Sequence, residues 1–200
     1  RGGKSLPAMP GCLWIHASSA GEVRAAKILI DALNKKGNHP SIVLSTFTQT
    51  GHDLARMENI EHVFRLPFDF PFWLHPIFDK LKPSQLILIE AEFWPSLLRL
   101  AKHRNVPVVL VNGRMSKRSS SRYQNILPFF RWITDPIVAF SMRTQVDAHR
   151  VLALGVPAQK VLVTGNIKFD AQTSDVRPTE KQSAQKHPWV VFGSTRPGDE

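Results

Sequence analysis

The chain has 200 residues, of which 42% are hydrophobic and 21% charged, a composition typical of a folded globular protein and not of a disordered one. No apolar run reaches the roughly 18 to 20 residues that span a bilayer, and the single cysteine, Cys12, excludes both an internal disulfide and a zinc site built from cysteines. The formal charge of +10 predicts an anionic partner: nucleic acid, an acidic membrane surface or a phosphorylated substrate.

Apolar, β-rich segments recur along the chain, and most are continuous rather than alternating. Continuous apolar runs are typical of parallel strands that are buried on both faces. The segments are residues 12–18, 41–47, 61–67, 85–91, 106–112, 136–142 and 160–166.

Helical patterns lie between several of these segments. Residues 23–37 end in Lys-Lys-Gly, a common helix stop, and residues 94–105 carry Pro95 near the first turn, where proline is tolerated. Residues 144–155 form a third helical pattern that ends at Gly155. Alternating strands and helices predict βαβ units and an open parallel sheet, an α/β fold of the Rossmann-like kind.

The composition changes after residue 170. Residues 1–170 are predicted to form one α/β domain, and the polar stretch 171–188 is predicted to be a linker. Residues 189–200, which include "WVVFGSTRPGDE", are expected to begin a second domain. The chain does not begin with Met and has no signal-peptide core, so we interpret it as a piece of a longer protein.

Ligands of an open parallel sheet bind outside the carboxyl ends of its strands, which directs attention to the loop "SSAGE" at residues 18–22. The spacing of Ser19 and Glu22 fits a capping box, which is a purely structural role. The same position also suits a carboxylate that accepts a proton from a sugar hydroxyl, with Gly21 allowing a ligand close to the backbone. The loop lacks the G-x-G-x-x-G pattern of a dinucleotide site.

The fourth apolar segment ends in "IEAEFWP", which holds Glu90 and Glu92. In an extended stretch these two carboxylates point the same way and repel, so one is expected to have a raised pKa or to face a cation. The alternative is a strand-end pair in solvent or at a helix N-terminus, where acids are favoured.

A basic segment follows the fifth apolar segment, and we interpret it as a loop that either binds phosphates or is simply solvated. Its cations are Arg114, Lys117, Arg118 and Arg122. The aromatic stretch 68–78 is expected to pack in the core, although such a stretch also suits a membrane interface or stacked nucleic-acid bases. His16 is expected to be a structural hydrogen-bonding residue, and the histidine spacing predicts no metal site.

Seven motifs together, in this order along residues 13–200, resemble the 3-deoxy-D-manno-octulosonic acid (Kdo) transferases of lipopolysaccharide synthesis. Three departures from the family patterns are Ala20, Ala91 and Ser96. The motifs are "LWIHASSAGE", "STFTQTG", "RLPFDFP", "IEAEFWPSL", "VNGRMSKRSSSRY", "VTGNIKFD" and "GSTRPGDE".

The resemblance implies a GT-B glycosyltransferase, with two Rossmann-like domains facing a cleft. This chain would then hold the N-terminal, acceptor-binding domain and only the start of the donor-binding domain, and would be inactive alone. The implied reaction moves Kdo from CMP-Kdo to the lipid A precursor (lipid IVA), with inversion and without a metal or other cofactor. The implied location is the cytoplasmic face of the bacterial inner membrane, either peripheral or through an anchor absent from this chain.

The resemblance also implies roles for individual residues. Glu22 is the general base, and Glu90 and Lys168 support the transition state, with Glu90 preferred to Glu92. The remaining implied residues bind the two substrates. They are Ser19, Gly21, Glu92, Arg114 and Arg118 for the acceptor, and Ser194, Thr195 and Arg196 for the donor.

Two other functions stay open at this point. One is a basic α/β module that binds nucleic acid or acidic lipid without catalysis, although no motif resembles an RNA-reading one. The other is a related GT-B enzyme that uses a UDP-sugar. Under the preferred interpretation the partners are CMP-Kdo, the lipid A precursor and an anionic membrane surface, and no nucleic acid.

Overall fold

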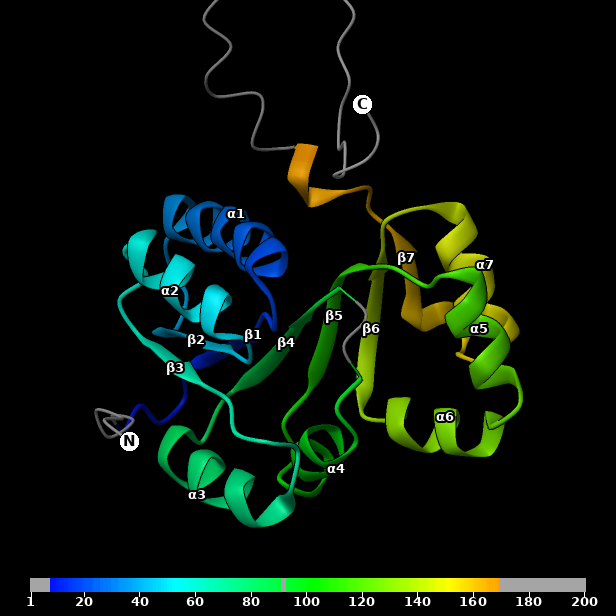
Figure 1. Cartoon of the computed structure of the whole chain (residues 1–200), viewed down its shortest axis with the longest axis horizontal. Helices are drawn as coiled ribbons and strands as arrows, with labels where there is room; N and C mark the ends of the chain where they lie inside the picture. The colour runs from blue at the N-terminus through cyan, green and yellow to red at the C-terminus, as the bar shows by residue number, and fades with distance from the viewer. Residues whose placement is uncertain (1–7, 91–92, 170–200) are drawn as a thin grey trace, which may run out of the picture.

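A computed structural model describes residues 8–90 and 93–169, and within these ranges seven strands form one parallel sheet (Figure 1). All seven expected strands are confirmed; each lies inside its expected range, except that β5 ends one residue beyond it. The strands are β1 Leu13–His16, β2 Ile42–Thr46, β3 Val63–Arg65, β4 Gln85–Ile89, β5 Val108–Gly113, β6 Ile137–Met142 and β7 Val161–Val163.

Helices connect the strands, as the predicted βαβ pattern requires. The three expected helices are confirmed as α1, α4 and α7, whereas the sequence analysis did not predict α2, α3, α5 or α6. The helices are α1 Ala20–Lys36, α2 Gln49–Met57, α3 Pro71–Leu81, α4 Pro95–His103, α5 Lys117–Gln124, α6 Leu127–Thr134 and α7 Gln145–Ala153, with a 3₁₀ turn at Ala158–Lys160.

The strand order is β3-β2-β1-β4-β5-β6-β7, so the chain builds the sheet outward in both directions from the β1–β4 pair. β1 and β4 run parallel in register, with Leu13 opposite Gln85 and His16 opposite Leu88. Their carboxyl ends therefore meet at one edge of the sheet, at the point where the strand order reverses. This is the position at which open α/β sheets bind ligands.

Helices cover the two faces of the sheet (Figure 1). On one face, Val23 and Ile30 of α1 pack with Ile15 and Ile87 of the central strands. On the other face, α3, α4, α6 and α7 bury a larger set of leucines and aromatic residues. Both faces of the central strands are thus dry, which explains their continuous apolar sequences.

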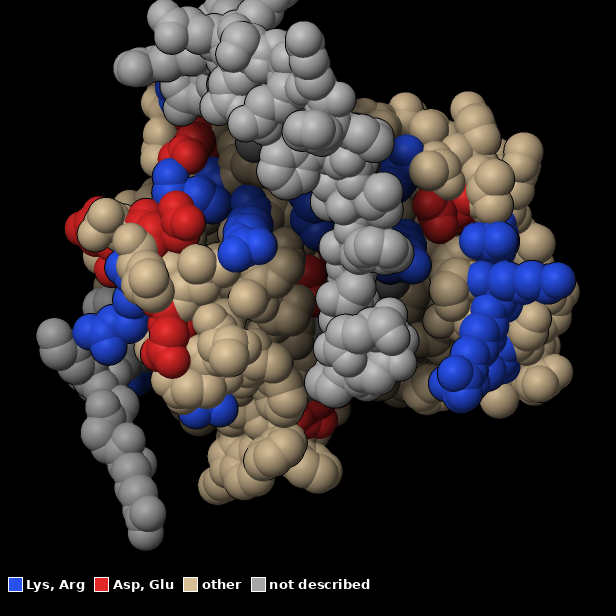
Figure 2. Space-filling model, turned by 45° about the horizontal axis from the view of Figure 1, so that its top comes forward, with Lys and Arg blue, Asp and Glu red and all other residues tan. Residues whose placement is uncertain are grey.

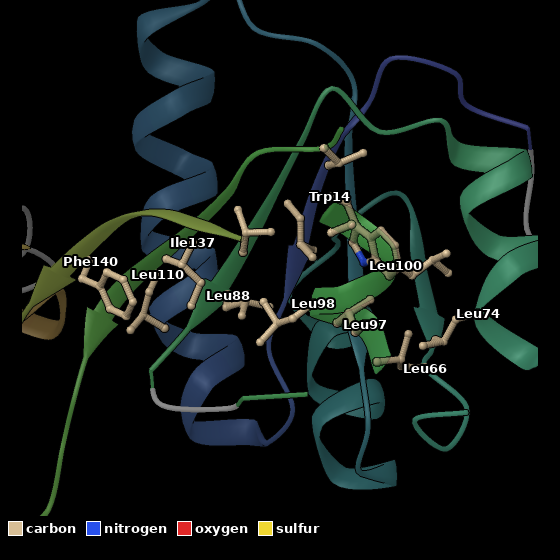
Figure 3. Packing of buried hydrophobic residues seen from close by; sticks show 14 of the residues in the cluster. Trp14, Leu66, Leu74, Leu88, Leu97, Leu98, Leu100, Leu110, Ile137 and Phe140 are labelled. Atoms are coloured by element: carbon tan, nitrogen blue, oxygen red, sulfur yellow. The ribbon is translucent and has the colours of Figure 1, made fainter. Parts of the chain in front are cut away.

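Trp14 lies at the centre of the larger core. Its side chain is fully buried, its ring meets Phe78 edge-on at 5.1 Å, and its Nε1–H donates to Ser45 Oγ at 2.8 Å. Figure 3 shows Trp14 from β1 with Leu97 and Leu98 from α4. The hydrogen bond allows a polar indole nitrogen to be buried without an unsatisfied donor.

The structure corrects the expectation of a basic loop after β5. Residues 117–124 form α5, and its N-cap is Ser116, whose hydroxyl accepts a hydrogen bond from the Ser119 amide at 3.0 Å. The helix buries only Ser120, so it carries no apolar period that would reveal it in the sequence.

The expectation that the aromatic stretch 68–78 packs in the core is wrong for its first half. Phe68, Phe70 and Phe72 are exposed, Phe72 to 82%, and α3 buries only Leu74, Phe78 and Leu81. The helix begins at Pro71, and one turn later its apolar face reaches the core.

Among the described residues no helix is long and apolar enough to cross a bilayer.

The amino end of α4 is held by a residue from a distant loop. Its N-cap, Trp94, makes no side-chain capping bond; instead Asp69 accepts hydrogen bonds from the Ser96 amide at 2.8 Å and the Leu97 amide at 2.9 Å. The Ser96 hydroxyl donates to the Asp69 carbonyl oxygen at 2.8 Å. Asp69 therefore fastens the segment before α3 to the start of α4.

Replacing Asp69→Ala should lower the free energy of unfolding by about 1 to 2 kcal/mol, because two amides at a helix start lose their acceptor. Urea denaturation of the 200-residue chain measures this change. Asp53→Ala, which removes an exposed carboxylate from α2, is the matched control and should change stability by less than about 0.5 kcal/mol. Equal stabilities of the two variants would contradict the capping role.

Candidate active site

Glu22 lies in the first turn of α1, directly after β1, and is 93% buried. Its Oε2 accepts a hydrogen bond from the Ser18 amide at 2.7 Å, and its Oε1 accepts one from the Ser19 hydroxyl at 2.8 Å. Two donors from the preceding loop thus fix the orientation of the carboxylate at the carboxyl edge of the sheet.

This geometry is not the capping box that the spacing predicts. Ser19 is the N-cap of α1, but its hydroxyl makes no bond to a helix amide and donates to Glu22 instead. Glu22 in turn reaches the amide of Ser18, one residue before the N-cap. The serine is therefore used to hold the acid and not to cap the helix.

The Ser18 backbone also joins this loop to the loop after β2. Its carbonyl oxygen accepts from the amides of Phe47 at 3.1 Å and Thr48 at 2.9 Å and from the Thr48 hydroxyl at 3.0 Å. Gly51 allows this approach, since a Cβ there would lie 3.2 Å from the Ser18 oxygen. The carboxylate of Glu22 therefore sits on a support built from two neighbouring strand ends.

Glu90 follows β4 and forms an ion pair with Lys168, whose Nζ lies 2.8 Å from Glu90 Oε1. This confirms that a carboxylate at this strand end faces a cation. The extended geometry assumed for this segment does not hold at Glu90, because β4 ends at Ile89 and Glu90 has φ 64°. A left-handed backbone is costly for a residue such as Glu, and such strain gathers at functional sites.

Lys168 reaches Glu90 because the chain turns back over the sheet after β7. Asn112 in β5, itself at φ 58° and buried, accepts a hydrogen bond through Oδ1 from the Ile167 amide at 3.2 Å. Ile167 packs on the apolar cluster beneath α1. The sequence analysis missed Asn112; its only signal was an Asn-Gly pair directly after an apolar run.

His16 is the last residue of β1 and is fully buried. Its Nδ1 lies 2.9 Å from Ser45 Oγ, which confirms the structural hydrogen-bonding role. Burial lowers the pKa of His16 to about 4, opposed by a hydrogen bond with the Ser45 backbone, so the ring is neutral at pH 7.

Buried polar atoms without a hydrogen-bond partner gather at this edge. Among the described residues five such side-chain atoms occur, and all five lie at a strand's carboxyl end or in the segment that follows it. They are His16 Nε2, Thr46 Oγ1, His52 Nδ1, Trp94 Nε1 and Asn112 Nδ2. Unsatisfied polar groups are rare in native interiors, where ordered water, an ion or a functional role usually accounts for each of them.

The predicted site residues thus form two groups, at the ends of the adjacent strands β1 and β4. Ser19 holds Glu22, and Lys168 holds Glu90. Gly21 is exposed, and no described atom lies within 4 Å of where its Cβ would stand.

Arg114, just before α5, and Arg118, in its first turn, are both exposed. Figure 2 shows Lys and Arg side chains gathered on the side of the molecule where α5 lies. Four predicted residues, Glu92, Ser194, Thr195 and Arg196, lie outside the described residues.

The chain was compared with known families and proteins. Residues 2–171 match the family model described as 3-deoxy-D-manno-octulosonic-acid transferase. The chain belongs to this family. It is 36% identical over 176 residues to the 3-deoxy-D-manno-octulosonic acid transferase of Haemophilus influenzae, an alignment that covers 87% of this chain and 41% of the relative.

A second Kdo transferase, from Chlamydophila psittaci, is 30% identical over an alignment that covers the whole chain and 49% of the relative. The chain therefore spans less than half the length of these two curated Kdo transferases.

The fold is shared with solved sugar-nucleotide enzymes. UDP-GlcNAc 2-epimerase from Neisseria meningitidis superimposes with a TM-score of 0.62 at 15% identity, over 80% of this chain and 48% of the epimerase. The expected Rossmann-like α/β fold of a GT-B protein is thereby confirmed for this member of the Kdo transferase family.

The low pKa of His16 predicts a pH-dependent stability. His16 takes up a proton near pH 6.5 in the unfolded chain and near pH 4 in the folded chain. The contribution of neutral His16 to the free energy of unfolding is therefore present at pH 7 and is lost as the pH falls from about 6.5 to 4. The loss attributable to this residue should reach up to about 3 kcal/mol.

Urea denaturation at pH 7 and pH 4.5 measures this dependence. His16→Gln should reduce the difference in stability between the two pH values, whereas the exposed control His149→Gln should leave most of it in place. An equal pH dependence in the parent and His16→Gln chains would show that His16 is not the titrating group.

Proposed function

We propose that the full-length protein transfers Kdo from CMP-Kdo to a phosphorylated lipid, the lipid A precursor, in an inverting and metal-independent reaction. Family membership supports the sugar and the reaction class. The observation that carries the proposal is Glu22: a buried carboxylate, held by two hydrogen bonds, at the carboxyl edge where the strand order reverses.

Glu22 acts as the general base of the proposed reaction. It takes the proton of an acceptor hydroxyl as that oxygen forms a bond to the anomeric carbon of Kdo, while the bond from that carbon to the CMP phosphate breaks and its electron pair leaves with CMP. The bonds from Ser18 and Ser19 keep the carboxylate in one orientation, which favours a positioned proton transfer.

Lys168 and Glu90 support the transition state of this transfer. The Lys168 ammonium carries the positive charge that suits the developing negative charge on the departing phosphate. Glu90 holds the ammonium through the 2.8 Å ion pair, and the left-handed backbone at Glu90 directs that carboxylate. Ser194, Thr195 and Arg196 are proposed to contact the donor, and Glu92 the acceptor.

The acceptor carries phosphates, and the cations around α5 provide a surface to attract them. Arg114, Lys117, Arg118 and Arg122 are all exposed. Near an anionic membrane face each such cation contributes roughly 1 kcal/mol of attraction. We therefore propose that the protein works at the cytoplasmic face of the inner membrane.

Glu22→Gln in the full-length enzyme should reduce the transfer rate by about 10² to 10⁴, because the general base is lost. The amide oxygen still accepts one of the two hydrogen bonds, so the melting temperature should change little. A radiolabelled Kdo assay measures the rate.

Glu58→Gln, an exposed change at the end of α2, is the control and should retain full activity. Turnover near that of the parent in Glu22→Gln would falsify the assignment of the base.

Arg114→Ala combined with Arg118→Ala should weaken binding to vesicles that contain the lipid A precursor, most strongly at low salt. Sedimentation of the full-length protein with vesicles across a salt series measures this. The control removes Lys35 and Lys36, two exposed cations at the far end of α1. Equal losses in the two double variants would show that net charge alone, and not this surface, is responsible.

A further inference from the structure

A groove of about 540 Å³ lies between α3, α4 and α6, outside the site described above. Pro71, Pro95, Leu100 and the ring of Trp132 give it an apolar lining. Its size and lining match pockets that bury an apolar ligand.

The groove starts near the carboxyl edge of the sheet. Trp94, which directly precedes the groove residues Pro95 and Ser96, meets the ring of His16 at the end of β1 edge-on at 5.4 Å, and Asp69 accepts a hydrogen bond from the Ser96 amide. At its other end lie His103 and Arg104, at the carboxyl end of α4. The nine residues of α4 extend about 13 Å, at 1.5 Å per residue. A chain-like ligand held at the active site can therefore continue along the groove.

The rim of the groove is cationic. Arg99 lies 4.5 Å above the centre of the Trp132 ring, and Arg104 contacts Asp79 at 2.8 Å and His75 at 3.3 Å. Residues 69–82, 95–104 and 127–135, which surround the groove, contain six Lys or Arg against three Asp, a formal +3. Such a rim suits a ligand that joins an apolar chain to an anionic group.

Exposed aromatic residues flank the groove on both sides. Of the thirteen large hydrophobic side chains that are exposed among the described residues, seven lie at 68–73 or 126–132. They include Phe72 and Trp73 on α3 and Phe129 on α6. Aromatic rings beside cations are typical of surfaces that meet lipid.

We propose that this groove binds one acyl chain of the lipid acceptor. The apolar lining receives the hydrocarbon, which enters at the Pro95 end and runs along α4 past Arg99. That the lipid is the acceptor rests on the proposed function. That the groove suits an apolar chain rests only on the residues that line it.

The first test needs no transferase activity. The probe is a single-chain alkyl phosphate with bromine near the end of its chain, added to the full-length protein below its micelle-forming concentration. Bromine quenches nearby tryptophan, so saturable quenching is expected, and Trp132→Phe should remove at least half of it. Equal quenching in both proteins, or quenching only by brominated bilayers, would overturn the proposal in favour of simple surface adsorption.

The second test asks whether the chain belongs to the acceptor. His75→Trp and His103→Trp place bulky groups in the groove at exposed positions, and Lys80→Trp is the control on the same α3 helix but outside the lining. The groove variants should raise KM for the acylated acceptor about tenfold with little change in kcat. A tenfold rise is the effect expected when roughly two methylene groups of the chain are no longer buried.

KM for a fully deacylated acceptor should stay unchanged in the same variants. An equal rise in KM for both acceptors, or no rise for either, would overturn the assignment to the acceptor. If no Kdo transfer is detected at all, the proposed function fails, and the quenching test alone decides whether the groove binds an acyl chain.

Discussion

The parallel pairing of β1 with β4 is the constraint on which the site depends. Because the chain builds the sheet in opposite directions from these two strands, the loops that follow them leave the same edge without crossing. Glu22 and Glu90 come from segments 68 residues apart and are placed on adjacent strand ends by backbone hydrogen bonds alone. The remaining contacts, from Ser18, Ser19, Asn112 and Lys168, orient the two carboxylates within that frame.

The edge is also where the fold carries its least favourable features. Glu90 has a left-handed backbone although it is neither glycine nor asparagine, the residues that adopt this conformation most readily. Several buried polar side-chain atoms there also lack hydrogen-bond partners. Elsewhere Asn38, Asn59 and Asn105 adopt positive φ, which asparagine tolerates, and Lys82 does so at the carboxyl end of α3. The dry core beneath, centred on Trp14 and Leu88, supplies the stability that allows such strain to persist.

The sequence predicts the sheet well because most strands are continuous apolar runs, the pattern that strands buried on both faces leave; only the edge strands β3 and β7 are more exposed. It does not predict α5, which buries one serine, or the exposed rings before α3, because neither has a helical apolar period. Glu22 and Glu90 could be predicted since their places follow from chain order. Asn112 and Asp69 could not, because their roles rest on partners 55 and 27 or more residues away.

Asp69 also connects the two proposed functional regions physically. Its carboxylate fixes the first amides of α4, and its own segment carries Phe68 and Phe70, the exposed rings that precede α3. The beginning of the groove, the flanking rings and the segment after Glu90 are therefore parts of one hydrogen-bonded unit. A lipid that seats its chain along α4, as proposed, would contact the helix start that Asp69 holds, so the proposed groove and the segment that follows β4 meet at Asp69.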